Sequence, residues 1–207
     1  MSEYEKEFTD SVAVLDDHLR RTNGPRQRAI LLNYIRHGYL EVAGRYEEIF
    51  APDMMVPHPV YHLVVGGRTV VLDGLDHVRG FYNAVISTRI AMWGIDEKLA
   101  VADWGFAGEL TFHSMLPGAA LAVEGQEVDD PQAIYVRSSR MAFVWPYTEN
   151  ALLIGEHIYE DLSTREVRKL SPGQEISRER VKQLCGEILQ RYDDDFASSR
   201  AALAAST

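Results

Sequence analysis

Residues 54–90, MMVPHPVYHLVVGGRTVVLDGLDHVRGFYNAVISTRI, contain the elements that decide the fold of this chain. Stretches rich in Val and Leu lie on both sides of Gly66 and Gly67, a pair that is typical of a two-residue hairpin turn. Asp73 then stands where a helix N-cap is expected, and apolar residues recur at helical spacing as far as Ile90. The stretch therefore predicts a β-hairpin followed directly by a helix.

Helices precede this stretch, and strands follow it. The expected elements are helices over 2–22 and 26–50, hairpin strands over 54–65 and 68–72, a helix from 73 to about 90, strands near 98–104, 106–116, 134–146 and 151–162, and a last helix that begins at Ser177. Gly38 and Gly44 can divide the second helix, and residues 117–131 are expected to form a loop. This order predicts α+β architecture, in which a curved, mixed or antiparallel sheet wraps around helices and encloses a pocket.

Length and charge limit the classes of protein that need to be considered. The 207 residues, of which 46% are hydrophobic, can bury one substantial core. We therefore expect an N-terminal helical extension over 1–24, one α+β barrel domain over 25–172, and a C-terminal helical tail over 173–207. A net charge of −10 argues against nucleic acid as a partner. The chain has neither a signal-peptide pattern nor a membrane-length apolar run, so we expect a cytoplasmic protein without a membrane partner.

Two histidines, His58 and His62, raise the question of a metal site. Pro57 and Pro59 exclude a helix here, so the segment is extended, and the two imidazoles lie roughly 13 Å apart along a strand. Two nitrogens that bind one zinc ion must be within about 4 Å of each other. With Cys185 as the single cysteine, multi-thiolate centres are excluded too, and no metal is predicted.

Three segments, IFAPDMMVPHPV, GLDHVRGFY and NALLIGEHIYEDL, resemble signatures of nuclear transport factor 2-like proteins, and most of all those of the SnoaL-like polyketide cyclase and ketosteroid isomerase branch. The resemblance covers about residues 28–170. It implies a cone-shaped α+β barrel that needs no cofactor and binds a small apolar ligand. Members of the family are frequently dimeric, and we expect a homodimer or higher homo-oligomer formed through the sheet face and the terminal helices. The family includes isomerases, cyclases, dehydratases and epoxide hydrolases, as well as proteins that only bind or assemble, so the fold alone does not choose among these functions.

The resemblance suggests roles for two residues. His58 occupies the place of the aspartate general base of the isomerase branch, and Tyr34 resembles in placement its tyrosine oxyanion donor. Since an imidazole changes charge at about pH 6.5, His58 suits proton transfer at neutral pH. The alternative for His58 is a hydrogen-bonded residue at the pocket rim without a catalytic role. The alternative for Tyr34 is a residue of the hydrophobic core.

The strand expected at 151–162 offers a second set of catalytic candidates. Alternation places His157, Tyr159 and Asp161 on one face, and the opposite face carries Glu156, Ile158 and Glu160. The first face combines a proton acceptor, a phenol donor and an orienting carboxylate, which suits a semi-polar pocket. Alternation does not decide which face is inward, because a shift of one residue exchanges them.

Further pocket candidates come from other segments. His113, with Glu109 nearby, faces the pocket if its side of the strand is inward. Large aromatic residues are core in most proteins, but where they line a pocket they predict an apolar, ring-containing substrate; here they are Trp104, Phe81, Tyr82, Phe143 and Trp145.

These observations predict a cofactor-independent enzyme that transfers a proton during isomerisation, cyclisation or dehydration of an apolar, cyclic carbonyl or hydroxylated compound. The chain has no G-x-S-x-G elbow and no glycine-rich phosphate-binding motif, so serine hydrolysis and nucleotide chemistry have no support. Two alternatives stay open, namely a non-catalytic ligand-binding or assembly module of the same fold, and the small subunit of an oxygenase.

Overall fold

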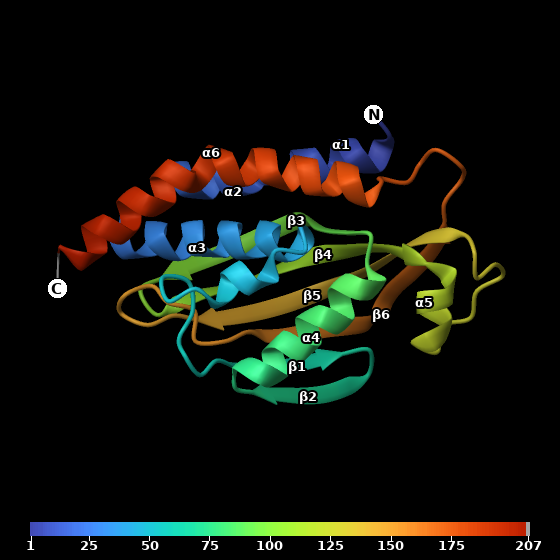
Figure 1. Ribbon diagram of the computed structural model, residues 1–207, viewed down its shortest axis with the longest axis horizontal. Coiled ribbons are helices and arrows are strands. Elements are labelled where there is room, and N and C mark those ends of the chain that lie inside the picture. The colour runs from blue at the N-terminus through green and yellow to red at the C-terminus, as the bar shows by residue number, and fades with distance from the viewer. Residues whose placement is uncertain (206–207) are drawn as a thin grey trace.

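The computed structural model of the protein describes residues 1–205. Figure 1 shows a helical layer in which α6 runs along α2 and α3, while α4 crosses in front of the sheet. The helices are α1 (Glu3–Asp10), α2 (Val12–Arg21), α3 (Pro25–Val42), the 3-10 helix η1 (Tyr46–Phe50), α4 (Leu75–Thr88), α5 (Gly118–Val123) and α6 (Arg178–Ala204). None of these helices within residues 1–205 is both long and apolar enough to cross a membrane.

One six-stranded sheet with the order β2-β1-β6-β5-β4-β3 forms the other layer. Its strands are β1 (Val60–Val65), β2 (Arg68–Asp73), β3 (Ala91–Ala102), β4 (Gly105–Pro117), β5 (Ile134–Pro146) and β6 (His157–Lys169). β1 and β6 are parallel, and the other neighbours are antiparallel. The sheet bends where its register shifts, between Ile95 and Lys98 in β3 and opposite Ser138 and Arg140 in β5. The expected α+β fold with a curved, mixed sheet is confirmed.

The β-hairpin forms where the glycine pair predicts it. Gly66 and Gly67 have φ values of 60° and 75°, the two positive angles that a tight hairpin turn requires. The helix after the hairpin begins with Gly74, and not Asp73, as its N-cap. The carboxylate of Asp73 instead lies 2.7 Å from Nε2 of His58, because the close approach of β1 and β2 brings the two together.

Several boundaries differ from the expected ones. The N-terminal helix divides at Ser11, and the second helix ends in a left-handed turn at Gly44, with φ 73°. The expected loop over 117–131 contains α5, and β3 begins at Ala91 instead of 98. The last strand runs over 157–169 and not over 151–162, since a left-handed residue, Ala151, turns the chain before it. These differences arise at turns, where local pattern carries little information.

Candidate functional site

Polar residues occur once per turn on the buried face of α3. Asn33, His37 and Glu41 are four residues apart, so their side chains lie above one another on one side of the helix. Asn33 has a structural role, because its amide donates to the carbonyl oxygens of Met54 at 2.8 Å and Ala151 at 3.3 Å. His37 and Glu41 therefore remain as the polar groups of this face that are available for chemistry.

His37 is fully buried and belongs to a hydrogen-bonded group that we call the His37 cluster, formed with Tyr61, Tyr82 and Glu156. Its Nε2 lies 2.7 Å from the Tyr82 hydroxyl and 3.0 Å from Oε1 of Glu156. The Tyr82 hydroxyl donates to the same Oε1 at 2.9 Å, and the Tyr61 hydroxyl is 3.0 Å from that of Tyr82. The cluster thus joins α3, β1, α4 and the residue before β6.

The number of hydrogens in the cluster decides the tautomer of His37. Tyr82 gives its single hydroxyl hydrogen to Glu156, so its oxygen accepts from its other neighbours. Nε2 of His37 faces this oxygen and the Glu156 carboxylate, both acceptors, and therefore carries the imidazole proton. Nδ1 then has a free lone pair, and it is buried with no hydrogen-bond partner in the described part of the chain. This is the arrangement of a base whose orientation is fixed by a carboxylate.

A second unpartnered polar atom lies close to His37. Nε1 of Trp145 is buried and makes no hydrogen bond within residues 1–205, and the rings of Trp145 and His37 have centroids 4.8 Å apart. Buried polar groups in proteins are almost always hydrogen-bonded, so a neighbouring donor and acceptor without partners suit a bound water or a ligand. A ligand hydroxyl group would satisfy both, because it can donate to Nδ1 of His37 and accept from Nε1 of Trp145.

Glu41, one turn after His37, has a carboxyl group that is an unusually weak acid. Burial, and then the negative charge of Glu156, raise the pKa of Glu41 from 4.5 to about 8. Glu41 is half-buried, and its carboxyl group makes no hydrogen bond or ion pair with the described residues. At neutral pH the site therefore contains a protonated carboxyl group one turn from the imidazole of His37, and carboxyl groups with such a raised pKa gather at functional sites.

The sequence missed the most buried members of this site. His37, Glu41, Tyr61 and Glu156 were not predicted, although Tyr82 was. One signal could have identified the first two, because polar residues at every fourth position of an otherwise apolar helix face require buried partners. Tyr61 and Glu156 gave no such signal, since strand alternation leaves their orientation open.

The structure places His58 outside the His37 cluster. Its side chain is 71% exposed and pairs with Asp73 at the base of the hairpin. A catalytic role for His58 stays a prediction, and the exposure of its side chain does not favour that role.

The last strand turns the opposite face inward from the one that carries the predicted catalytic residues. Glu156 is buried and Ile158 packs on the core, whereas Tyr159 is 46% exposed and Asp161 lies at the surface. His157 instead packs edge-on against His62, with ring centroids 4.8 Å apart. The register explains the orientation: Leu63 and Ile158 lie opposite each other, and both face the core. The structure thus decides the face that alternation left open, and the catalytic roles of His157, Tyr159 and Asp161 stay predictions.

His113 lies on the other face of the sheet from the aromatic residues of β4. It stacks on Trp93 with ring centroids 5.1 Å apart, and its Nδ1 is 2.6 Å from the Ser138 hydroxyl. Burial lowers the pKa of His113. Glu109 is also remote from the cluster, because its carboxylate pairs with Lys98. The structure thus does not bring His113 together with His37.

Tyr34 is the predicted catalytic residue that does approach the cluster. Its ring contacts Trp145, with centroids 5.2 Å apart, and its hydroxyl donates to Oε1 of Glu97 at 2.6 Å. Burial raises the pKa of Glu97 to about 7, although the hydrogen bond from Tyr34 lowers it. The hydroxyl of Tyr34 is therefore already engaged by a carboxyl group of β3.

The predicted substrate-binding aromatic residues divide between core and surface. Phe143 and Trp145 are buried and pack with Tyr34 and Phe106, so they fill the interior beneath α3. Phe81 is half-buried beside Tyr82, whereas Trp104 is 49% exposed at the turn between β3 and β4 and is not part of this interior.

Comparison with known proteins supports the fold. No protein-family model and no curated protein matches the sequence. Among solved structures, a protein identified as a SnoaL-like polyketide cyclase from Jannaschia sp. CCS1 superposes with a TM-score of 0.51 at 11% identity, covering 69% of this chain and 92% of that one. This likeness confirms the expected fold, in which a curved α+β sheet wraps around helices.

Two further structures are similar at lower TM-scores. The epoxide hydrolase/cyclase-like enzyme SalBIII of salinomycin pyran ring formation has a TM-score of 0.46 at 12% identity, over 68% of this chain and 95% of that one. RV0760c from Mycobacterium tuberculosis, in complex with estradiol-17β-hemisuccinate, has a TM-score of 0.44 at 14% identity, over 70% and 99%.

Proposed function

We propose that this protein is a cofactor-independent enzyme that moves a proton on an apolar, cyclic carbonyl or hydroxylated compound, with His37 as the base. The observation that carries the proposal is the buried Nδ1 of His37, which has no partner in the described residues, while a carboxylate holds Nε2. An imidazole fixed in this way can accept a proton at Nδ1 without prior rearrangement.

The roles of the neighbouring groups follow from their charge. His37 takes a proton from the carbon next to the substrate carbonyl, and Glu156 stabilises the imidazolium that forms. Negative charge moves to the carbonyl oxygen, where the protonated carboxyl group of Glu41 or the indole N–H of Trp145 donates a hydrogen bond. Return of the proton from His37 to a second carbon completes an isomerisation. In a dehydration, the hydroxyl group takes up this proton and leaves as water.

A ligand-binding module without catalysis is the second candidate. It is favoured by the aromatic packing beneath α3, where Phe106, Phe143 and Trp145 contact one another and Tyr34. Such packing provides a rigid apolar wall, which binds rings but performs no chemistry by itself.

Exchange of substrate protons with solvent distinguishes these functions. Cyclic ketones such as 2-tetralone are incubated in D₂O, and NMR follows the loss of the protons next to the carbonyl. We expect the wild-type protein to accelerate exchange and His37→Gln to lose the acceleration. The matched control is His77→Gln, which alters an exposed histidine that contacts the Asp73 carbonyl. This variant should accelerate the exchange of the ketone protons as much as the wild-type protein does.

Three outcomes would change the conclusion. Unchanged exchange in His37→Gln would refute the role of His37. Loss of exchange in His58→Gln but not in His37→Gln would assign the base to the hairpin, as the sequence resemblance implies. Ketone binding without exchange in the wild-type protein would favour the ligand-binding module.

A further inference from the structure

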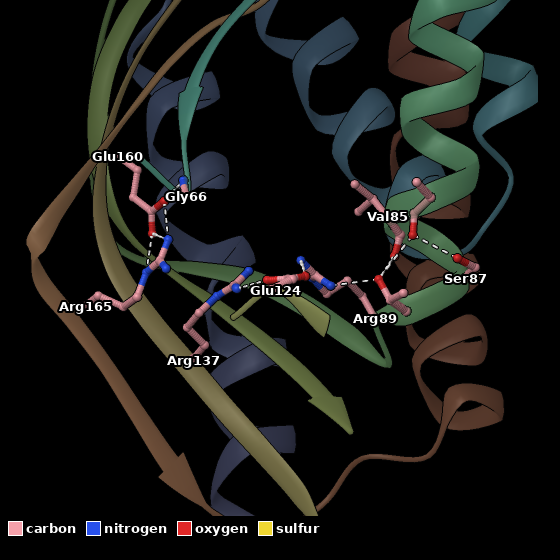
Figure 2. Close-up of polar contacts among 10 residues, drawn as sticks. Gly66, Val85, Ser87, Arg89, Glu124, Arg137, Glu160 and Arg165 are labelled. Atoms are coloured by element: carbon pink, nitrogen blue, oxygen red, sulfur yellow. Dashed lines mark hydrogen bonds and ion pairs between the residues drawn. The ribbon is translucent and has the colours of Figure 1, made fainter. Parts of the chain in front are cut away.

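Two arginines on facing elements hold one carboxylate between them. Arg89 follows the last residue of α4, Arg137 lies on β5, and Glu124 follows the last residue of α5. Nη2 of Arg89 is 2.7 Å from Oε1 of Glu124, and Nη1 of Arg137 contacts the other oxygen, Oε2. Figure 2 shows the three side chains in a row between the sheet and α4, with the pair formed by Glu160 and Arg165 beside them.

This group contains one positive charge more than it can neutralise. The side chains of Arg89 and Arg137 are 11% and 14% exposed, and neither pairs with a second carboxylate among residues 1–205. Burial lowers the pKa of Arg89, Glu124 raises it, and the charge of Arg137 lowers it again, so the two guanidinium groups repel each other. Burying an incompletely matched charge is costly, and a second anion would offset that cost. The excess is unusual in a chain with a net charge of −10.

Attachment of α5 does not explain the second arginine. Leu121 of α5 is fully buried in an apolar cluster with Leu116 and Tyr135, which already holds the helix on the sheet. A single arginine would neutralise Glu124. The pair therefore fits a different purpose, the binding of an oxyanion that comes from outside the chain.

The arginines face the same interior as the His37 cluster. The register of β4 and β5 is unbroken from Pro117 to Gly105, so alternation places Arg137 on the face of β5 that carries Phe143 and Trp145. Arg89 comes seven residues after Tyr82, which corresponds to about 10 Å along α4. An elongated ligand that lies along α4 would therefore extend from Arg89 towards Tyr82 of the His37 cluster.

We propose that Arg89 and Arg137 bind the carboxylate of the small-molecule ligand, and that Glu124 occupies this site until the ligand arrives. Each arginine contacts a different oxygen of Glu124, so a planar carboxylate takes its place without loss of a hydrogen bond. Glu124 can leave, because its side chain is 34% exposed and Gly125, with φ 85°, follows it. The ligand is then an apolar, cyclic carboxylic acid, and its reaction at His37 rests on the proposed function.

Paired probes test the site by binding alone. Isothermal titration calorimetry compares 2-naphthylacetate with its uncharged amide and with 2-naphthyl phosphate. We expect the wild-type protein to bind the carboxylate about tenfold more tightly than the amide. Glu124→Gln should bind the carboxylate several-fold more tightly still, because it removes the internal competitor, and should bind the amide as before. Arg137→Gln should bind both probes equally.

The control is Arg79→Gln, which alters a half-exposed arginine of α4 that pairs with Glu47 and Asp76, and it should retain the wild-type preference. Equal affinity of the wild-type protein for carboxylate and amide would overturn the proposal, as would absence of binding or an unchanged affinity in Glu124→Gln. Tighter binding of the phosphate would overturn the carboxylate assignment. Misfolding cannot mimic the gain expected for Glu124→Gln. The exchange experiment on His37 has a separate readout, so each proposal can fail without the other.

Discussion

Replacement of Glu41 by Gln should stabilise the protein at alkaline pH and leave its stability unchanged in acid. The carboxyl group of Glu41 faces the interior one turn after His37, without a hydrogen-bond partner among the described residues. Burial and the charge of Glu156 raise its pKa from 4.5 to about 8. Glutamine keeps the shape of the side chain and cannot ionise.

The direction of the pH dependence follows from the two pKa values. Between the pKa of the unfolded chain, 4.5, and that of the folded protein, about 8, the folded state holds a proton that the unfolded state has lost. The stability of the wild-type protein therefore falls as the pH rises through this window. A gap of about 3.5 pKa units corresponds to about 5 kcal/mol of unfolding free energy. Part of the side chain is open to water, which screens the charge, so we expect Glu41→Gln to gain about 3 kcal/mol above pH 8.

Urea denaturation followed by circular dichroism measures this gain. The unfolding free energies of wild type and Glu41→Gln are compared at about pH 5 and about pH 9. The difference in unfolding free energy between the two proteins should be larger at the higher pH. Glu149→Gln, which alters an exposed carboxylate in the turn after β5, is the matched control. If the offset between Glu41→Gln and wild type is the same at both pH values, the carboxyl group does not occupy the environment described above.

Two further predictions concern backbone space and a second carboxyl group. Gly155→Ala should destabilise the protein by about 3 kcal/mol, because the new Cβ would lie 1.8 Å from the carbonyl oxygen of Val60. Gly186→Ala in α6 has open space around it and should instead stabilise by about 0.5 to 1 kcal/mol, and thermal unfolding of both variants checks the contrast. Tyr34→Phe removes the hydrogen bond that lowers the pKa of Glu97, so that pKa should rise above about 7 in a carbon-13 NMR titration, and an unchanged value would contradict the hydrogen bond.

The candidate base of the site could not be predicted from the sequence. His58 attracted attention because of its neighbours along the chain, yet it lies at the surface against Asp73. His37 has no such setting in the sequence, and it becomes a candidate base only when Glu156 and Tyr82 are brought to its Nε2 by folding. A hydrogen-bond network among distant elements cannot be predicted from spacing along any one of them.

The sequence by itself determined the elements whose causes are local. Two glycines with positive φ make the hairpin, and the apolar period of residues 25–42 makes the helix α3. Only the tertiary structure decided which face of β6 is inward, because a strand offers two faces and the pairing of Leu63 with Ile158 selects one of them. The same pairing brings Glu156 to His37. Burial raises the pKa of Glu41, and the charge of Glu156 raises it further, because both effects depend on proximity in space and not on order in the chain.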